Sequence, residues 1–252
     1  MEEYIKEFES FKEAIIFDFN VGHGGIGDYI KFLMIVLTIC MKSNKRFYQK
    51  INNTELERYI RLKHSAFYIS KDQISKIEHA SVERPGHHYH HDVYNGDISP
   101  SEVFTFTDDV IKNAKHILPS LPDKYISLHL RMGDKFLETD KRFVKCTKDE
   151  RIRVSDKDID IFISNRNEPV IFFCDNHSKR LEIKKRHNNI IITDSEIGHT
   201  SLKNTTQKQT LDAVTDFYIL TNSSEIYIAS NSGFSKLASL FNNVPIIRVT
   251  SA

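Results

Sequence analysis

The chain of 252 residues contains no tryptophan and only three cysteines, at Cys40, Cys146 and Cys174. Cysteines that are so few and so far apart offer neither a disulfide framework nor a pair of metal ligands, and they are typical of reduced cytoplasmic proteins. The formal net charge is only +1, so no basic field indicates a nucleic acid as partner. These scarcities predict a cytoplasmic protein whose partners are not nucleic acids.

Long hydrophobic runs are scarce as well. The most apolar segment, Phe32–Met41, lies between Lys31 and Lys42 and is much shorter than the about 20 residues that span a bilayer. The first residues, MEEYIKEFESFKEA, are acidic and lack the apolar core of a signal peptide. We therefore expect a globular protein without an integral membrane segment, in which Phe32–Met41 forms a buried helix.

The second half of the chain alternates short apolar runs with segments of helical pattern. The apolar runs are Tyr125–Leu130, Val170–Cys174, Ile190–Thr193, Ile226–Ala229 and Ile246–Val249. The helical segments between them are Asp156–Asn165, His177–His187, Thr210–Thr221 and Ser232–Phe241. Strands that are apolar throughout are typical of a parallel sheet with both faces covered. We expect a doubly wound α/β unit from about residue 123 onward.

The first half begins in the same way, with an apolar strand at Ala14–Asp18, a glycine-rich loop and a long helix. After it the pattern predicts a helix over Thr54–Leu62, a strand over Ala66–Ile69 and a helix within Ser101–Ile117. Prolines in the segment LPSLP at 118–122 disfavour a helix there and predict a boundary near residue 120. The expected architecture is α/β, with two Rossmann-like lobes (1–120 and 121–252) and a ligand cleft between them.

Three segments carry candidate chemistry, the first being GHGGIGDYIKFLM at 22–34. Its glycines allow backbone N–H groups to approach an anion, although their spacing fits neither the dinucleotide fingerprint nor the P-loop. It is either a phosphate-facing loop or a strand-to-helix turn.

The second segment, HLRMGDKFLE at 129–138, follows an apolar strand. Arg131 can grip a diphosphate through paired N–H donors, and Asp134 can orient Arg131 or bind a hydroxyl; a strand-end salt bridge is the alternative.

The third segment, IASNSGFSKLASLF at 228–241, places small polar residues between a strand and an amphipathic helix. Hydroxyls and free N–H groups at a helix N-terminus make a phosphate site without a metal, although a helix cap alone explains one of these residues. A further carboxylate, Asp175, ends the run VIFFCDN. It either accepts hydrogen bonds from a ribose or base, or caps the helix that follows.

The motifs GGIGD, HLRMGD, FFCDN and SNSGFSKLASL, in this order, resemble the GT-B fucosyltransferase superfamily of α-1,2-, α-1,6- and protein O-fucosyltransferases. The resemblance spans residues 22–241. It implies inverting transfer without a metal or other cofactor, from a nucleotide-diphosphate sugar, typically GDP-fucose, as co-substrate to a glycan hydroxyl. The chain departs from the family pattern at three places. Met132 replaces the second arginine, Asp28-Tyr29 replaces an Asn-Gln pair, and Lys236-Leu237 replaces the paired tryptophans. Another deoxyhexose on GDP, or another nucleotide, therefore stays open.

The resemblance also implies roles for individual residues. Arg131 would hold the β-phosphate, His129 and Asp134 would shape that site, and Asp175 would face the nucleoside. The residues that would close on the donor pyrophosphate and base are Ser230, Asn231, Ser232, Phe234 and Ser235, and the glycines that would let the first lobe approach it are Gly24, Gly25 and Gly27.

The chemistry requires neutralisation of the leaving diphosphate and a base for the acceptor proton. The charge of the leaving diphosphate would be neutralised by Arg131, assisted by Asp134, and by the helix N-terminus at Ser232. Asp28 and Glu138 are the candidate carboxylate bases. The acceptor would lie on the first lobe, and the sequence gives no indication of an oligomeric state.

Two other patterns resemble metal sites. Four histidines lie within GHHYHHD at 86–92, and DKDID at 156–160 imitates a D-x-D motif. We expect an exposed loop for the first and the acidic first turn of a helix for the second, and hence no metal. The alternative functions are a catalytically weak nucleotide-sugar or glycan-binding protein and a metal-dependent transferase.

Overall fold

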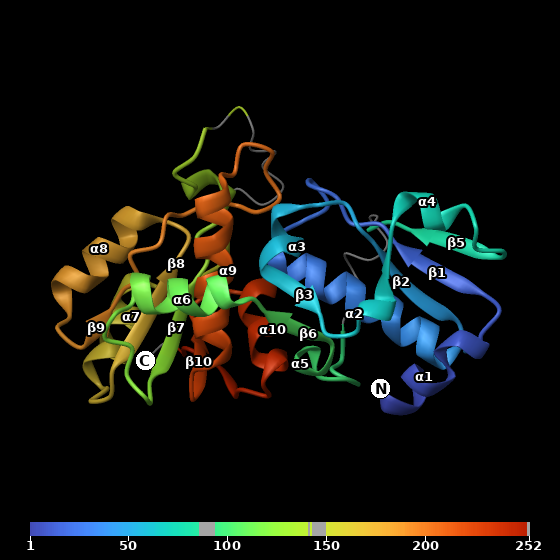
Figure 1. Cartoon of the computed structure of the whole chain (residues 1–252). Coiled ribbons are helices and arrows are strands. Elements are labelled where there is room, and N and C mark those ends of the chain that lie inside the picture. The colour runs from blue at the N-terminus through green and yellow to red at the C-terminus, as the bar shows by residue number, and fades with distance from the viewer. Residues whose placement is uncertain (86–93, 141, 143–149, 251–252) are drawn as a thin grey trace.

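The computed structural model describes residues 1–85, 94–140, 142 and 150–250. Two parallel β-sheets lie at opposite sides of the molecule with helices between and around them (Figure 1). The first sheet has the order β4-β2-β1-β5, with β1 Ala14–Phe17, β2 Arg46–Lys50, β4 Tyr68–Ile69 and β5 Ala80–Glu83. The second has the order β11-β10-β7-β8-β9, with β7 Ile126–Leu130, β8 Val170–Cys174, β9 Ile190–Ile191, β10 Glu225–Ile228 and β11 Ile246–Arg248. The predicted α/β class with parallel sheets is confirmed.

The helices follow the strands as expected for doubly wound sheets. Those of the first half are α1 Glu2–Glu7, α2 Ile26–Lys42, α3 Glu55–Tyr59, α4 Lys71–Ile74, α5 Pro100–Val103 and α6 Asp108–Ile117. Those of the second half are α7 Asp156–Ser164, α8 His177–Arg186, α9 Gln207–Thr221 and α10 Gly233–Phe241. The short 3-10 helices are η1 Phe8–Ser10, η2 Ser65–Phe67 and η4 Asp134–Phe136. The sequence pattern thus predicts each of these strands and α-helices of the second half to within three residues at each end.

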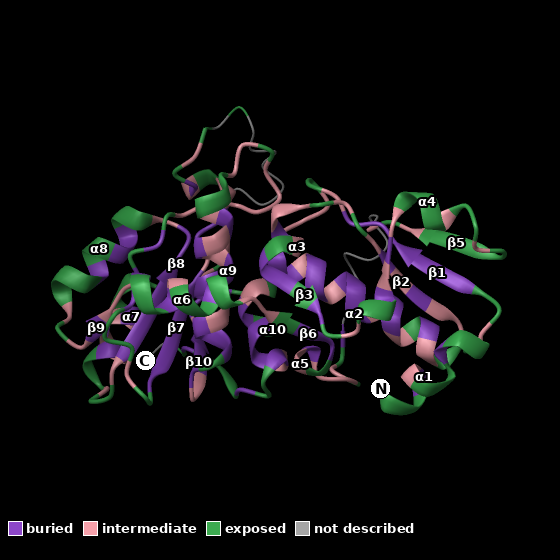
Figure 2. Ribbon diagram, in the orientation of Figure 1, coloured by how far each residue is buried: buried purple, intermediate pink, exposed green. Residues whose placement is uncertain are grey.

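The strand order of the second sheet creates a topological switch point. β7 comes first in the chain; β8 and β9 lie on one side of it, and β10 and β11 on the other. All residues of β7 and β8 are buried (Figure 2). Successive residues of each strand face opposite sides, so Phe172 packs in a cluster with α7 and α8, whereas Ile171 and Phe173 pack with α9 and α10. Ligands of such sheets bind at the carboxyl ends of the strands that flank the switch point, here β7 and β10.

The first half departs from the sequence expectations where strands pair over long distances. Instead of one helix over 54–62, a capping box of Thr54 and Glu57 starts α3, and the chain then extends as β3 Ile60–Leu62. β3 pairs antiparallel with β6 Phe104–Phe106, whereas the helix expected within 101–117 is confirmed as α6. Of the strand expected over 66–69, only the last two residues are extended, as β4. Pairing between distant segments overrides the local helical preference.

The two lobes share one hydrophobic core. A single cluster of buried side chains runs from Tyr4 in α1 to Val244 after α10. α6 precedes residue 120 but packs on α9, where Asn113 Nδ2 donates to Asp212 Oδ1 (2.8 Å) and to Thr215 Oγ1 (3.0 Å). The division into 1–120 and 121–252 stays a prediction, and the structure adds that α6 belongs to the packing of the second sheet.

Among the helices of the described residues, none combines the length and apolar character needed to cross a membrane. Phe32–Met41 instead lies inside α2, where Phe32, Leu33 and Leu37 are fully buried, so the expected buried helix is confirmed. Cys40 and Cys174 are buried free thiols, whereas Cys146 lies outside the described residues.

Candidate active site

The loops that follow β7 and β10 are joined at the switch point of the second sheet. The backbone N–H of Arg131 donates to Ser230 Oγ at 2.7 Å. Residues 150–155 run across both loops: Arg151 N donates to Met132 O, and Val154 N donates to Ala229 O, each at 2.9 Å. Two of the three predicted motifs therefore meet, as their positions at the ends of neighbouring parallel strands require.

The guanidinium of Arg131 is held between two carboxylates. Nη2 lies 2.7 Å from Asp134 Oδ1, and Nη1 lies 3.0 Å from Asp175 Oδ2. Asp175 also accepts the backbone N–H groups of Met132 (2.7 Å) and Gly133 (3.2 Å). The strand-end ion pair considered for Arg131 is thus present. Asp175 binds the turn after β7, so it does not cap α8.

The cap of α8 is instead supplied by two other residues. Asn176 Oδ1 accepts the N–H of Lys179 at 2.8 Å. Glu138, a candidate base, accepts the N–H groups of His177 (2.9 Å) and Ser178 (3.1 Å). Burial raises the pKa of Glu138, but these hydrogen bonds outweigh it and hold the pKa below its ordinary value. A carboxylate with a lowered pKa is a weaker proton acceptor.

His129 is one of the buried titratable groups of this site. Its side chain is on β7, its ring centroid lies 5.5 Å from that of Phe234, and the residue is only 5% exposed. Burial lowers the pKa to about 4; the Asp175 carboxylate opposes this shift, and the positive charges of Arg131 and Arg180 add to it. His129 is therefore neutral at pH 7, and its Nδ1 has no hydrogen-bond partner among the described residues.

The start of α10 presents its N-terminal N–H groups beside this ring. Ser232 is the N-cap, and its Oγ accepts the N–H of Phe234 at 3.3 Å. Ser235 Oγ is fully buried and donates to the carbonyl of Ser232 at 3.3 Å, while Asn231 is exposed. Ser232 is thus a helix cap in the described state, and α10 directs its positive end to the switch point.

The glycine-rich loop of the first lobe contacts the start of α10 directly. A Cβ on Gly27 would lie 2.9 Å from the carbonyl carbon of Gly233 and 3.1 Å from the N of Phe234. No side chain fits in this contact, so the first residues of α2 lie directly on those of α10. Gly24 has a φ of 132°, and Asp28, the other candidate base, accepts the N–H of Gly25, the N-cap of α2, at 3.2 Å. All three predicted motifs therefore meet at one place.

Two residues near the meeting point of the three motifs, His199 and Arg151, belong to no motif that the sequence analysis identifies. His199 Nδ1 accepts the N–H (3.3 Å) and the hydroxyl (2.6 Å) of Ser201, which leaves the ring proton on Nε2. Burial, together with the charges of Arg131 and Arg151, lowers the pKa of His199 to about 4, and the carboxylates of Asp134 and Asp175 oppose this shift. The ring also lies near the glycine-rich loop, because its Cε1 would be 3.7 Å from a Cβ on Gly25. Both residues come from irregular segments without a motif.

One of the two patterns that resemble metal sites is a helix start. Asp158 belongs to the capping box of α7, and Asp156 pairs with Lys179 at 2.9 Å, so DKDID is the first turn of a helix as expected. No group of three or more potential ligands for a metal occurs in the described residues. The four histidines at 86–92 lie outside them.

A second polar cluster, which the sequence analysis missed, lies at the carboxyl end of β1 in the first sheet. Asp18 is 2% exposed and lies 3.1 Å from Lys50 Nζ and 3.0 Å from Arg84 Nε. Burial raises its pKa, but hydrogen bonds from Asn52, Lys50 and Arg84 outweigh this and lower it to about 2. Asp18 therefore remains ionised and holds the ends of β1, β2 and β5 together.

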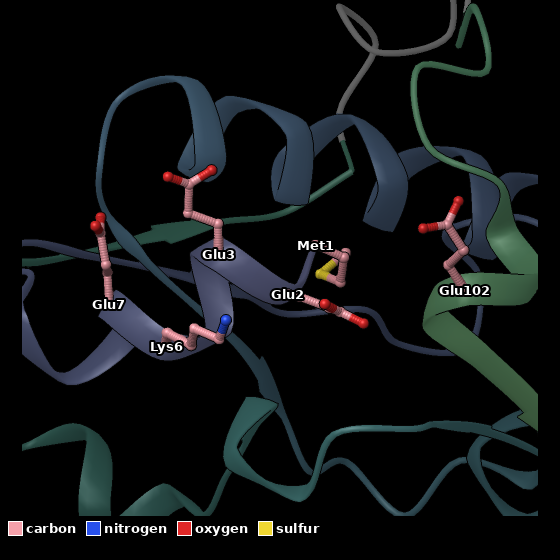
Figure 3. A pocket seen from close by; sticks show the side chains of 6 residues that line it. All are labelled: Met1, Glu2, Glu3, Lys6, Glu7 and Glu102. Carbon is pink, nitrogen blue, oxygen red and sulfur yellow. The ribbon is translucent and has the colours of Figure 1, made fainter.

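Two hollows of the surface differ in their relation to these contacts. One of about 740 Å³ lies between α1 and α5 and is lined by Lys6 and acidic side chains that spread apart rather than converge (Figure 3). The other, of about 510 Å³, follows residues 150–156 and adjoins the site through Arg151. Neither lies between α2 and α10, so the interlobe cleft stays a prediction.

Comparison with known proteins gives matches in structure only. No protein-family model and no curated protein sequence matches the chain. Among solved structures it is similar to NodZ α-1,6-fucosyltransferase soaked with GDP-fucose (TM-score 0.57, 10% identity, 94% of this chain and 95% of that one). An Arabidopsis thaliana FUT1 mutant in complex with GDP gives a TM-score of 0.57 at 8% identity, over 98% and 74% of the two chains. POFUT1 in complex with GDP gives 0.54 at 10% identity, over 94% and 98%.

The chain has the GT-B fold of these fucosyltransferases. The fold expected from the motif resemblance is therefore confirmed over nearly the whole chain. Within this GT-B fold, the switch point of the second lobe and the glycine-rich loop of the first lobe face one another across the contact of Gly27 with Gly233.

Proposed function

We propose that the chain is a fucosyltransferase-like glycosyltransferase that moves fucose or a related deoxyhexose from a GDP-linked donor to a glycan hydroxyl. The observation that carries the proposal is the meeting of three polar motifs at the switch point of the second sheet, against the glycine-rich loop of the first lobe. Structural neighbours with this fold were solved with GDP or GDP-fucose, which favours the donor class.

In the proposed reaction the acceptor oxygen bonds to the anomeric carbon as the bond from that carbon to the β-phosphate oxygen breaks. Configuration inverts, the acceptor proton passes to a base, and GDP leaves. The N-terminus of α10 and the nearby guanidinium groups neutralise the charge of the diphosphate without a metal. The group at the helix start would line the donor pocket: Ser230, Asn231, Ser232, Phe234 and Ser235.

The structure qualifies the residue roles that the resemblance implies. Asp175 and Asp134 hold Arg131 in place, and neutral His129 lies beside Phe234 under the start of α10. Asp28 is the favoured base because it lies on the first lobe next to the glycine-rich loop, where we expect the acceptor. Glu138, whose hydrogen bonds to α8 lower its pKa, is the second candidate.

A second candidate function is a nucleotide-sugar-binding protein with little or no turnover. The favouring observation is that two carboxylates already neutralise Arg131, while Met132 replaces the second arginine of the resembling family. Donor turnover separates the two functions, because both predict donor binding and only the first predicts release of GDP in the presence of an acceptor.

The test is a thermal-shift panel of GDP, UDP, ADP, CMP and dTDP and their sugars, each with magnesium and with EDTA. A ligand at 100 times its dissociation constant stabilises the fold by about 2.7 kcal/mol, which raises Tm by about 5–10 °C for a chain of this size. We expect a shift with guanine nucleotides that survives EDTA, followed by GDP release in a coupled assay. A shift that requires magnesium would refute metal independence, and no shift with any nucleotide would refute the proposed function.

A further inference from the structure

Arg151 is the cation of this site for which the described residues supply no counterion. Its guanidinium makes no ion pair or hydrogen bond with any of them, and its Nε is buried without a partner. The neighbouring Arg153 differs, since it pairs with Glu150 at 3.2 Å and lies over the ring of Phe136. An unpaired buried donor of an ionised group is costly, and a catalytic role or an ion that binds there is among its explanations.

The backbone of Arg151 places it at the switch point. Its N–H donates to the carbonyl of Met132 at 2.9 Å, and Arg153, two residues on, forms a β-bridge with Ser230. Residues 151–153 thus cross from the end of β7 to the end of β10. Ile152 between them is 87% exposed, so the chain turns Ile152 outward, whereas the Nε of Arg151 is buried.

His199 lies within electrostatic range of both arginines, because the positive charges of Arg131 and Arg151 each lower its pKa. Its Nδ1 is occupied by Ser201, so Nε2–H is the available donor. His129 on β7 also has a buried Nδ1 without a partner among the described residues. The guanidinium of Arg151 and the Nε2–H of His199 are therefore hydrogen-bond donors for which the described residues supply no acceptor.

We propose that Arg151 supplies the positive charge that binds the donor diphosphate, that His199 donates a hydrogen bond to the same group through Nε2–H, and that Arg131 is a positioning residue. The inference rests on the proposed function, because a nucleoside diphosphate is the anion concerned. Arg131 shares its charge between Asp134 and Asp175, whereas Arg151 retains a full unit of charge. Arg151 thereby restores, from a different segment, the positive charge that Met132 does not provide.

The experiment compares Arg151→Ala, Arg131→Ala and the matched control Arg153→Ala by titration calorimetry with GDP, guanosine and inorganic pyrophosphate. We expect Arg151→Ala to weaken GDP and pyrophosphate binding about 10- to 100-fold, the usual loss of a charge-assisted hydrogen bond, with guanosine binding unchanged. Its Tm without ligand should stay within about 1–2 °C of the wild type, since no protein partner is lost. Arg153→Ala should bind GDP within about twofold of the wild type.

Arg131→Ala should instead lower Tm without ligand, because it leaves the carboxylates of Asp134 and Asp175 without their cation. Wild-type GDP affinity in Arg151→Ala would overturn the inference and leave the proposed function intact. Arg151-dependent binding of pyrophosphate by a protein that binds no nucleotide would support the anion site and refute the proposed function. His199→Gln, which keeps an N–H donor, should bind GDP more tightly than His199→Ala; equal affinities would remove His199 from the site.

Discussion

The contact between Gly27 and Gly233 allows a test of how the lobes are joined, using two substitutions of the same kind. In Gly27→Ala the new methyl group would lie 2.9 Å from the carbonyl carbon and 3.1 Å from the carbonyl oxygen of Gly233. These are backbone atoms at the start of a helix, so they cannot swing aside as a side chain does. In Gly233→Ala the methyl group meets nothing within 4 Å, and the φ of Gly233 is not in the left-handed region.

The magnitude follows from two opposing effects. Overpacking by one methyl group costs about 1–3 kcal/mol when the surroundings must shift. Alanine is up to about 1 kcal/mol better than glycine in a helix interior, and less at the first turn, where Gly27 lies. Gly27→Ala should therefore lower the free energy of unfolding by about 1–2 kcal/mol, which corresponds to a Tm lower by about 2–8 °C. Gly233→Ala should be neutral or gain up to about 1 kcal/mol.

Urea unfolding of the wild type and both variants measures these differences directly. The m-value should be the same in all three, because the unfolded surface hardly changes. Equal stability of Gly27→Ala and the wild type would show that α2 and α10 do not touch at these residues. Destabilisation by Gly233→Ala to the same extent as by Gly27→Ala would show that loss of glycine, and not the contact, is responsible.

Two further predictions concern buried charge. The pKa of His129 is about 4 in the folded state, against an ordinary value of 6.5. As the pH falls, the unfolded chain therefore takes up a proton at this residue before the folded chain does. The free energy of unfolding should fall by about 3 kcal/mol between pH 6.5 and 4. His129→Asn should remove that part of the pH dependence in urea titrations at several pH values; an unchanged slope would contradict it. The second prediction concerns Arg180 and Asp216, which form a buried ion pair at 2.9 Å. Arg180→Met should lower the free energy of unfolding by about 3–5 kcal/mol, because it leaves the Asp216 carboxylate buried without its cation. The control, Lys185→Met at an exposed position, should lower it by less than about 0.5 kcal/mol. Equal effects of the two would refute the role of the pair.

The sequence alone predicted the strands and α-helices of the second sheet. Val170–Cys174 is predicted residue for residue, because a strand buried on both faces must be apolar throughout and the polar helices on either side mark its ends. The same reasoning places Arg131 and Ser230 at the carboxyl ends of strands. Their adjacency follows from the parallel sheet and is confirmed by the hydrogen bond between them. Local periodicity encodes these features, so no tertiary information was needed.

Only the tertiary structure decided which groups complete the site. Arg151 and His199 lie in irregular segments whose positions depend on backbone hydrogen bonds to Met132 and on the packing of distant loops. The pairing of β3 with β6 is likewise non-local and overrides a helical pattern. Gly27 and Gly233 are far apart in sequence, so their contact exists only because both lobes pack on one core. Local pattern fixes most of the strands and helices of the second sheet, whereas packing between distant segments decides the pairing of β3 with β6 and which charges are paired.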